Sequence, residues 1–360
     1  MMESDDPAVG ARNLLLHCAQ ARPGERLMIV YESDQLGIYG AGLVEALSAA
    51  AKELGLSVAT REVGFSKAVQ DLPPELSAQL IAADHAVFFA RVGDQLRFRA
   101  LPKGTRAIVS YALDTGMLGS GFGRADYRAF KELKTAIDRM MAQADEIHVT
   151  CALGTEFRGS AKARPGIEPA DTSVLRFPMS VFTPLASKDF SGRVAIARFL
   201  VGTGSHYYQP YGLPLSEPIF AEIGDGEIQG FSGNPTDVER ARAHYAYVGD
   251  LLGVEPYLIH SWHAGIHPGC AYAMQAEHNY ERWSCGAFGN PRILHFHTCG
   301  NYAPGEICWN IIDATVRVDG VDLWDSGVFR PDRLTSGMEI MHQYPDVIQF
   351  FKSPRREIGL

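Results

Sequence analysis

The chain has 360 residues, of which 46% are hydrophobic and 21% charged, and its formal net charge is −9. This is the composition of a globular protein with one large or two ordinary domains, and the lack of a basic footprint argues against a nucleic-acid partner. No stretch approaches the roughly 18 apolar residues of a membrane span, so no membrane partner is expected.

The first 150 residues alternate between strand and helix patterns. Short apolar runs predict strands at 26–31, 57–63, 86–90, 107–111 and 146–151. Apolar residues at helical spacing predict helices at 43–54, 75–83 and 127–144. This alternation indicates an α/β layer with a mostly parallel sheet.

After residue 151 the pattern changes to short strands separated by Gly/Pro turns. Strands are expected at 194–201, 219–222, 227–231, 256–263, 292–298, 309–318 and 321–324, with one long helix at 236–252. We therefore predict two domains: an N-terminal α/β domain at 1–153 and a C-terminal β-rich α+β domain at 154–360, to which the histidine-rich segment described below assigns the catalytic metal site.

The cysteines and the start of the chain indicate a cytoplasmic protein. Six cysteines form no CxxC pair, and residues 1–12 are acidic without an apolar core. Free thiols in a reducing compartment are expected, and a secretory signal is not. Four cysteines fall between Cys270 and Cys308, which leaves a sulfur ligand open, although a buried structural role is the commoner fate.

Half of the twelve histidines lie in one short stretch: His260, His263, His267, His278, His295 and His297. Histidine is the commonest metal ligand and the usual acid–base group near neutral pH. Alternate residues of a strand share a face, so His295 and His297 should point the same way. By the same rule His263 shares a face with Ser261, and His260 should face the other side.

A carboxylate is also available, at Asp313 in an otherwise apolar segment. Two or three neutral imidazoles with one carboxylate fit mononuclear Fe(II), and also Zn or Mn. A single histidine or aspartate is more often an ordinary polar residue. The HxH pair and the density of histidines make a metal or acid–base site the better interpretation.

Other candidates have ordinary explanations of equal or greater weight. Arg158 and Lys162 could hold an anionic substrate group, and Glu156 could help them to orient the substrate, although a solvated turn is the commoner outcome. Trp262 and Trp309 could line an aromatic substrate pocket, and core packing explains them equally well. The glycine-rich segment 119–123 is interpreted as a mobile loop, and 205–211 as a connection or a substrate-covering loop.

Six segments, in order, resemble motifs of one family: 154–160, 177–184, 214–219 with 225–228, 261–268, 295–301 and 311–313. On these the chain resembles the aminopeptidase T-like metallopeptidase family over residues 12–330, especially its branch containing 2,5-dihydroxypyridine 5,6-dioxygenase. The resemblance implies the two-domain fold and, by analogy with family members, a homo-oligomer.

The ligand positions depart from both branches of that family. Ser180 and Ser261 stand where the peptidases have glutamate ligands, and Ile311 stands at the histidine of their HxD motif. Only His295 and Asp313 match, so a two-metal peptidase site is not expected. The dioxygenase branch holds one iron with two histidines and one aspartate, and its histidines fall at Ser261 and Ile311.

Strand periodicity offers a replacement set for one metal: His263, His295, His297 and Asp313. The favoured hypothesis is a non-haem Fe(II) dioxygenase that cleaves the ring of a small hydroxylated or amino-substituted aromatic or heteroaromatic compound with O2. His260 or His267 would act as general base. The alternatives are a metallohydrolase (amidase, deaminase or aminopeptidase-like) that uses a metal-activated water, and a metal-free binding or scaffold protein.

Overall fold

The computed structural model describes residues 5–68, 72–99, 101, 105–162 and 172–360. One layer is a parallel sheet in the order β2-β1-β3-β4-β7. Its strands are β1 (Arg26–Tyr31), β2 (Ser57–Glu62), β3 (His85–Phe89), β4 (Arg106–Ser110) and β7 (Leu175–Phe177). The buried, continuously apolar strands β1 and β3 are typical of a parallel sheet covered on both faces.

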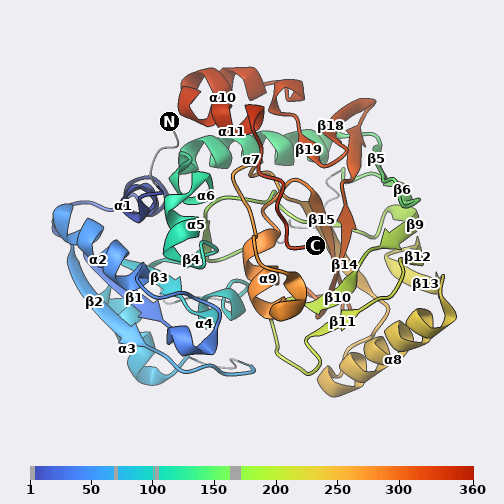
Figure 1. Ribbon diagram of the computed structural model, residues 1–360, viewed down its shortest axis with the longest axis horizontal. Helices are drawn as coiled ribbons and strands as arrows, with labels where there is room; N and C mark the ends of the chain where they lie inside the picture. The colour runs from blue at the N-terminus through green and yellow to red at the C-terminus, as the bar shows by residue number, and fades with distance from the viewer. Residues whose placement is uncertain (1–4, 69–71, 100, 102–104, 163–171) are drawn as a thin grey trace.

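The helices of this half connect and cover the parallel strands (Figure 1). They are α1 (Pro7–Arg12), α2 (Leu43–Glu53), α3 (Pro74–Ala82), α4 (Arg91–Gln95), α5 (Thr115–Gly119), α6 (Gly121–Arg124) and α7 (Tyr127–Gln143), with a π-helical turn η1 (Asn13–Ala19) and a 3-10 turn η2 (Asp34–Leu36). The expected mobile loop at 119–123 is therefore wrong, because this segment forms the end of α5 and most of α6. A Cβ at Gly123 would lie 2.0 Å from the carbonyl oxygen of Leu118, so the close approach of the two turns requires glycine.

Two antiparallel sheets form the other half. The eight-stranded sheet has the order β13-β12-β9-β6-β5-β17-β18-β19. Its strands are β5 (Ile147–Thr150), β6 (Glu156–Gly159), β9 (Phe190–Ile196), β12 (Ile219–Gly224), β13 (Glu227–Ser232), β17 (Thr315–Val318), β18 (Val321–Asp325) and β19 (Val328–Phe329).

The six-stranded sheet, in the order β11-β10-β16-β15-β14-β8, carries the histidine-rich segment. Its strands are β8 (Leu185–Ala186), β10 (Phe199–Gly202), β11 (Gly212–Pro214), β14 (Ile259–Ala264), β15 (Ile293–Thr298) and β16 (Ile307–Ile312). The remaining helices are α8 (Pro235–Leu252), α9 (Tyr280–Ala287), α10 (Gly337–Gln343) and α11 (Ile348–Lys352), with 3-10 turns η3 (Ala276–His278), η4 (Pro331–Arg333) and η5 (Pro345–Val347).

The fold class predicted from the sequence is confirmed, with an α/β layer followed by a β-rich part. Two strands cross the boundary expected after residue 153: β5 belongs to the eight-stranded sheet, and β7 to the parallel sheet. The two-domain division remains a prediction. Two predicted strands are each split: 194–201 into β9 and β10, and 309–318 into β16 and β17, with left-handed residues Arg198 and Asp313 at the breaks.

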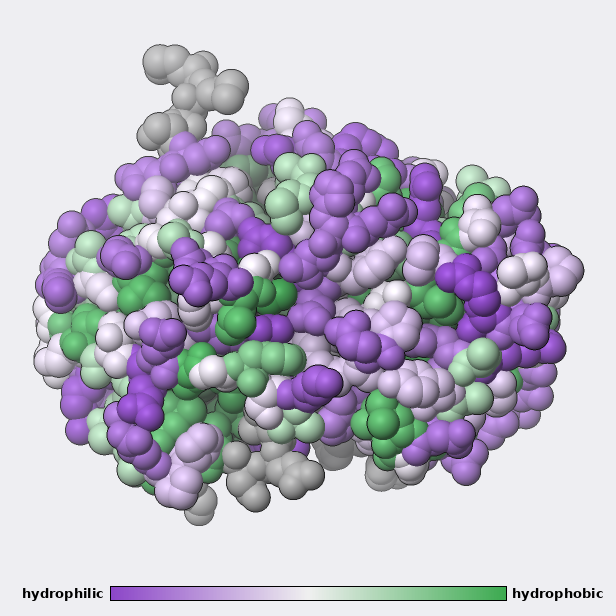
Figure 2. Space-filling model, turned by 60° about the horizontal axis from the view of Figure 1, so that its bottom comes forward, coloured by the Kyte–Doolittle hydropathy of each residue, from purple (hydrophilic) through white to green (hydrophobic). Residues whose placement is uncertain are grey.

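Figure 2 shows hydrophilic residues over most of one face, with hydrophobic residues in separate patches. Among the described residues, no helix combines the length and apolar character needed to cross a bilayer. All six cysteines are free thiols.

Candidate metal centre

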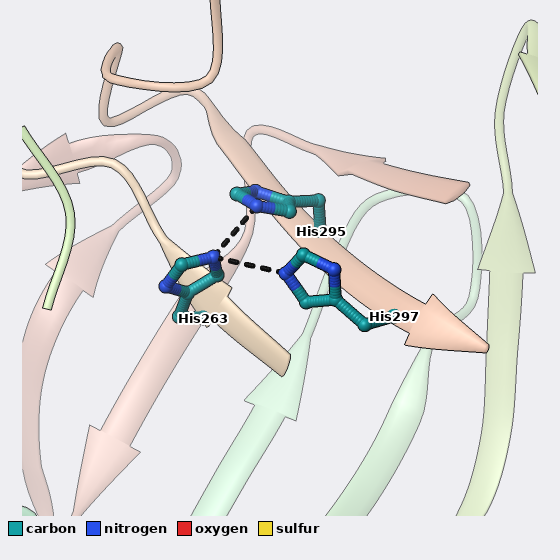
Figure 3. Close-up of side chains that lie close together, drawn as sticks. All are labelled: His263, His295 and His297. Atoms are coloured by element: carbon teal, nitrogen blue, oxygen red, sulfur yellow. Dashed lines mark hydrogen bonds between the residues drawn. The ribbon is translucent and has the colours of Figure 1, made fainter. Parts of the chain in front are cut away.

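Neighbouring antiparallel strands bring three histidines together. His263 on β14 lies directly opposite His295 on β15, and His297 lies opposite Ser261. Opposed residues of an antiparallel pair project to the same face, and so do residues two apart on one strand. The three imidazoles therefore share one face of the six-stranded sheet, and Figure 3 shows them pointing toward one another.

The contacts between these rings are short. Nε2 of His263 lies 2.7 Å from Nε2 of His295 and 3.2 Å from Nε2 of His297. One nitrogen from each ring lies within 4.8 Å of the others, and all three residues are buried. Three imidazole nitrogens in this arrangement form a set that a single cation can bridge after small side-chain rotations.

The protonation states favour metal binding. Burial, followed by the neighbouring His263, lowers the pKa of His295 and of His297 well below the usual value for histidine. Both rings are therefore neutral near pH 7, which is the state that binds a metal. Nδ1 of His263 lies 2.8 Å from the backbone oxygen of Phe182, which can only accept. His263 therefore carries its proton on Nδ1 and presents the lone pair of Nε2 to the cluster.

Three further polar atoms at this face are buried without a hydrogen-bond partner among the described residues. They are Nδ1 of His295, Nδ1 of His297 and the side-chain oxygen Oδ1 of Asn310. Asn310 on β16 lies directly opposite His295, so its carboxamide projects to the same face. Unpaired buried polar atoms are costly, and they are more often found where a ligand or ion completes the site.

The three histidines line a pocket between the parallel sheet and the six-stranded sheet. Its wall includes Phe288, whose ring stacks on His295 at a centroid distance of 4.1 Å. Further aromatic side chains in the lining are Phe98, Tyr111 and Phe122, and the charged side chains there are Asp94, Arg97 and Arg176. The pocket thus combines apolar walls with convergent polar groups, as small-molecule sites do.

His260 also lines this pocket, although strict alternation predicts the opposite face. The register between β14 and β15 shifts between Ile259 and Ser261, so His260 is the extra residue of a β-bulge. Its Nδ1 lies 2.8 Å from Oγ of Ser261. Burial lowers the pKa of His260 to about 4, so the ring is a neutral proton acceptor at pH 7.

Asp313 does not join the three histidines, which corrects the predicted ligand set. It follows the end of β16 with a left-handed φ of 53°, where the chain leaves the six-stranded sheet for β17. Both of its carboxylate oxygens accept hydrogen bonds from Arg292, at 2.7 and 2.6 Å. The residue of β16 that projects beside His295 is Asn310.

Glu156, Arg158 and Lys162 are exposed and line no part of this pocket among the described residues. Glu156 pairs with His148 and Arg158 on the outside of the eight-stranded sheet, and Lys162 pairs with Asp145. The substrate-orienting role expected for them has no support in this geometry, because a solvated ion pair on another sheet cannot reach the histidines.

Trp262, Trp309 and His267 are core residues. The two tryptophans are fully buried on the opposite face of the sheet from the histidines, where both pack against Phe296. His267 stacks on Phe130 at 3.9 Å, and burial lowers its pKa to about 3. None of the three lines the pocket, which removes the observation that favoured a substrate or catalytic role.

In the segment 205–211, the buried side chains are Tyr207, Tyr208 and Tyr211.

Several residues at the site escaped the sequence interpretation: Arg97, Arg176 and Tyr111 line the pocket, and Asn310 lies opposite His295. Arg97 and Tyr111 lie just after α4 and β4, Arg176 and Asn310 lie in β7 and β16, and no spacing along the chain relates them. The one available signal was position: Arg176 immediately precedes the segment 177–184 that carries the family resemblance.

Comparison with known proteins supports the fold. No family model matches the chain, and no curated protein matches it by sequence. Eight chains of solved structures do match. One is 2,5-dihydroxypyridine dioxygenase from Pseudomonas putida, with 15% identity and a TM-score of 0.61, over 90% of this chain and 96% of that one. This chain has the same fold.

A second match is wild-type AmpT from Thermus thermophilus, with 11% identity and a TM-score of 0.48, over 87% of this chain and 94% of that one. The resemblance to the dioxygenase branch, first seen in short motifs, is found again in three dimensions in the first of these structures. At these identities the likeness concerns the fold alone.

Proposed function

We propose that the chain is a mononuclear metal-dependent enzyme with His263, His295 and His297 as its protein ligands. Fe(II) is the favoured metal. The reaction is the oxygenative ring cleavage of a small hydroxylated or amino-substituted aromatic or heteroaromatic compound by O2. The observation that carries this proposal is the convergence of three buried Nε2 atoms in a pocket with aromatic walls. The fold shared with a dioxygenase adds support.

The residues at the site fit a divalent cation. Three imidazole nitrogens lie together, and the proton on Nδ1 of His263 is fixed by the oxygen of Phe182. Bound Fe(II) would supply a Lewis-acidic centre with open positions for a chelating substrate and O2.

The protein groups around the ligands then bind the substrate and manage its proton. His260 accepts a proton from a substrate hydroxyl, and its Nδ1 contact with Ser261 fixes the ring. Phe288 packs on His295 and holds that ring in place. The apolar walls exclude water, which strengthens every polar contact made inside.

A metallohydrolase is the second candidate, because no carboxylate of the described residues joins the three histidines. Three histidines with an open fourth position form the donor set of one class of catalytic zinc site, in which a bound water becomes the nucleophile. An amidase, a deaminase or an aminopeptidase-like activity would use the same pocket with Zn or Mn.

Oxygen consumption separates the two candidates. Protein reconstituted anaerobically with Fe(II) is mixed with hydroxylated and amino-substituted aromatic compounds, and O2 uptake is followed with an electrode. Uptake coupled to loss of the ring absorbance supports the dioxygenase, whereas turnover of amides by Zn-loaded protein without O2 supports the hydrolase. No stoichiometric metal, and no effect of replacing His295 or His297, would instead favour a metal-free binding protein.

The setting of the enzyme is part of the same proposal. We expect a cytoplasmic homo-oligomer that binds neither nucleic acid nor a membrane. The six free thiols agree with a reducing compartment. Size-exclusion chromatography with light scattering measures the oligomeric state directly.

A further inference from the structure

Two buried arginines line the same pocket as the three histidines. Arg97 follows α4, and Arg176 lies in β7 at the edge of the parallel sheet. Each is only 7% exposed. A buried guanidinium is rare because desolvating a charge is costly, so two in one pocket wall indicate that this wall is used to bind something.

Arg97 is fixed in place by several acceptors. It forms an ion pair with Asp94, and it donates to the backbone oxygens of Asp94 (2.9 Å) and Thr203 (2.7 Å). Tyr111 donates to the same Asp94 carboxylate at 2.7 Å. The charge of Arg97 is therefore balanced by Asp94, and the network forms a rigid polar wall.

Charged side chains of the pocket wall lie close to the three histidines. Within the part of the chain that the structure describes, the lining residues with a permanent charge are Arg97, Arg176 and Asp94. A divalent cation held by the three histidines would add two positive charges beside these side chains. Both arginines are also close enough to contribute to the lowered pKa of His295 and His297, after burial and the neighbouring histidine.

We propose that the substrate is an aromatic acid, whose carboxylate binds Arg176 while its chelating groups face His263, His295 and His297. The second half of this proposal rests on the metal-dependent function proposed above. A guanidinium has five donors in a planar fork that matches a carboxylate, and it can serve a protein neighbour and a ligand together. Phe98, Phe122 and Phe288 provide the apolar surface for the ring.

The test compares an acid with its neutral isostere. Binding of 3,4-dihydroxybenzoate and 3,4-dihydroxybenzamide to the Zn-loaded protein is measured by calorimetry, since Zn is inert to O2 and both probes carry the same catechol. The acid should bind about 10-fold or more tightly than the amide, the size of effect expected for a charge-assisted pair. Equal affinities in the wild-type protein would overturn the proposal.

Variants of Arg176 test whether this residue causes the preference for the acid over the amide. Arg176→Met should reduce the acid-to-amide ratio to about one, and Arg176→Lys should keep part of it, because the charge remains while the fork is lost. Arg158→Met, at an exposed arginine outside the pocket, is the matched control and should keep the full ratio. A full ratio in a folded R176M protein would overturn the proposal; if R176M does not fold, R176K and the wild-type comparison still decide.

A final measurement separates this proposal from the metal function. If the wild-type protein takes up no Zn, the metal-dependent function fails, and benzoate is then compared with benzamide on the metal-free protein. A preference for benzoate that is reduced in R176K and lost in R176M would uphold the carboxylate site alone. The absence of any preference would overturn it as well.

Discussion

The Nε2 atoms of His263 and His295 lie 2.7 Å apart across the β14–β15 pair. His263 keeps its proton on Nδ1, so the proton in this contact belongs to Nε2 of His295. Two nitrogens bound to one zinc-sized ion lie roughly 3.3 Å apart, given tetrahedral geometry and bonds of about 2.0–2.1 Å. Metal binding must therefore break this hydrogen bond, separate the rings slightly and move the proton of His295 from Nε2 to Nδ1 or to solvent.

Replacing a single ligand tests the site directly. His263→Ala, H295A and H297A should each lower the affinity for Zn or Fe(II) by more than about 100-fold, beyond the usual effect of outer-shell changes. Asp313→Asn should keep wild-type affinity, because its carboxylate is engaged by Arg292. Metal content after dialysis, measured by mass spectrometry, checks both. Loss of metal in D313N with retention of metal in H295A would contradict the three-histidine site and favour Asp313 as a ligand.

Asn310 should act as the partner of His295 when a metal is bound. Its unpaired Oδ1 lies on the neighbouring strand opposite a ring whose Nδ1 is also unpaired. Once the proton of His295 moves to Nδ1, this oxygen becomes its acceptor. Asn310→Ala should therefore weaken metal binding by about 10-fold, the lower end of the range for such partners.

A spectroscopic readout separates this role from packing. In the metal-loaded wild type, nitrogen NMR should place the proton of His295 on Nδ1, and in N310A that proton should exchange faster with solvent. Cys308→Ala, on the same strand opposite His297, is the matched control. An unchanged His295 spectrum in N310A would contradict the assignment.

The sequence predicted the parts of the site that depend on strand alternation. His295 and His297 share a face because β15 is regular, and His263 follows from the same rule. The prediction failed where regularity ends. The bulge at His260 turns that ring into the pocket, and the left-handed residue Asp313 ends β16, so that a carboxylate three residues past Asn310 lies at the wrong place.

No local sequence pattern could predict that two arginines line the pocket. Arg97 and Arg176 are 79 positions apart by residue number. They line the same pocket because α4 follows β3 and β7 joins the parallel sheet beside β4. Only the tertiary arrangement of the sheets places them opposite the histidines. For the same reason the exposed pair Arg158 and Lys162 looked equally suitable in the sequence.

Trp309 should contribute to stability and not to ligand binding. It is fully buried and packs against Phe231, Tyr245 and Phe296, on the far face of the sheet from the histidines. Trp309→Phe should lower the free energy of unfolding by about 1–3 kcal/mol, as expected for a large-to-small core substitution. Metal affinity, measured by competition with a chelator at a temperature where both proteins are folded, should change less than twofold. A large loss of metal affinity would contradict this assignment and indicate that Trp309 contributes to the site.

The contact between His206 and Glu306 should make stability depend on pH. Nδ1 of His206 lies 2.6 Å from Oε1 of the fully buried Glu306, and this hydrogen bond raises the pKa of His206 above 6.5. A group whose pKa is raised by folding stabilises the folded state fully below its unfolded pKa, and this contribution is lost as the pH rises through the folded pKa. His206→Gln should therefore cost most near pH 5.5 and little at high pH.

Urea denaturation at pH 5.5, 7 and 9 measures the difference between wild type and H206Q. The buried rings of His244 and His260, with their pKa values lowered to about 4, act in the opposite direction. Their stabilisation is present above pH 6.5 and is lost as the pH falls, but both proteins share it, so it cancels in the difference. His278→Gln, at an exposed histidine, controls for loss of an imidazole. A difference that stays constant across the three pH values would show that the contact contributes no charge-dependent stability.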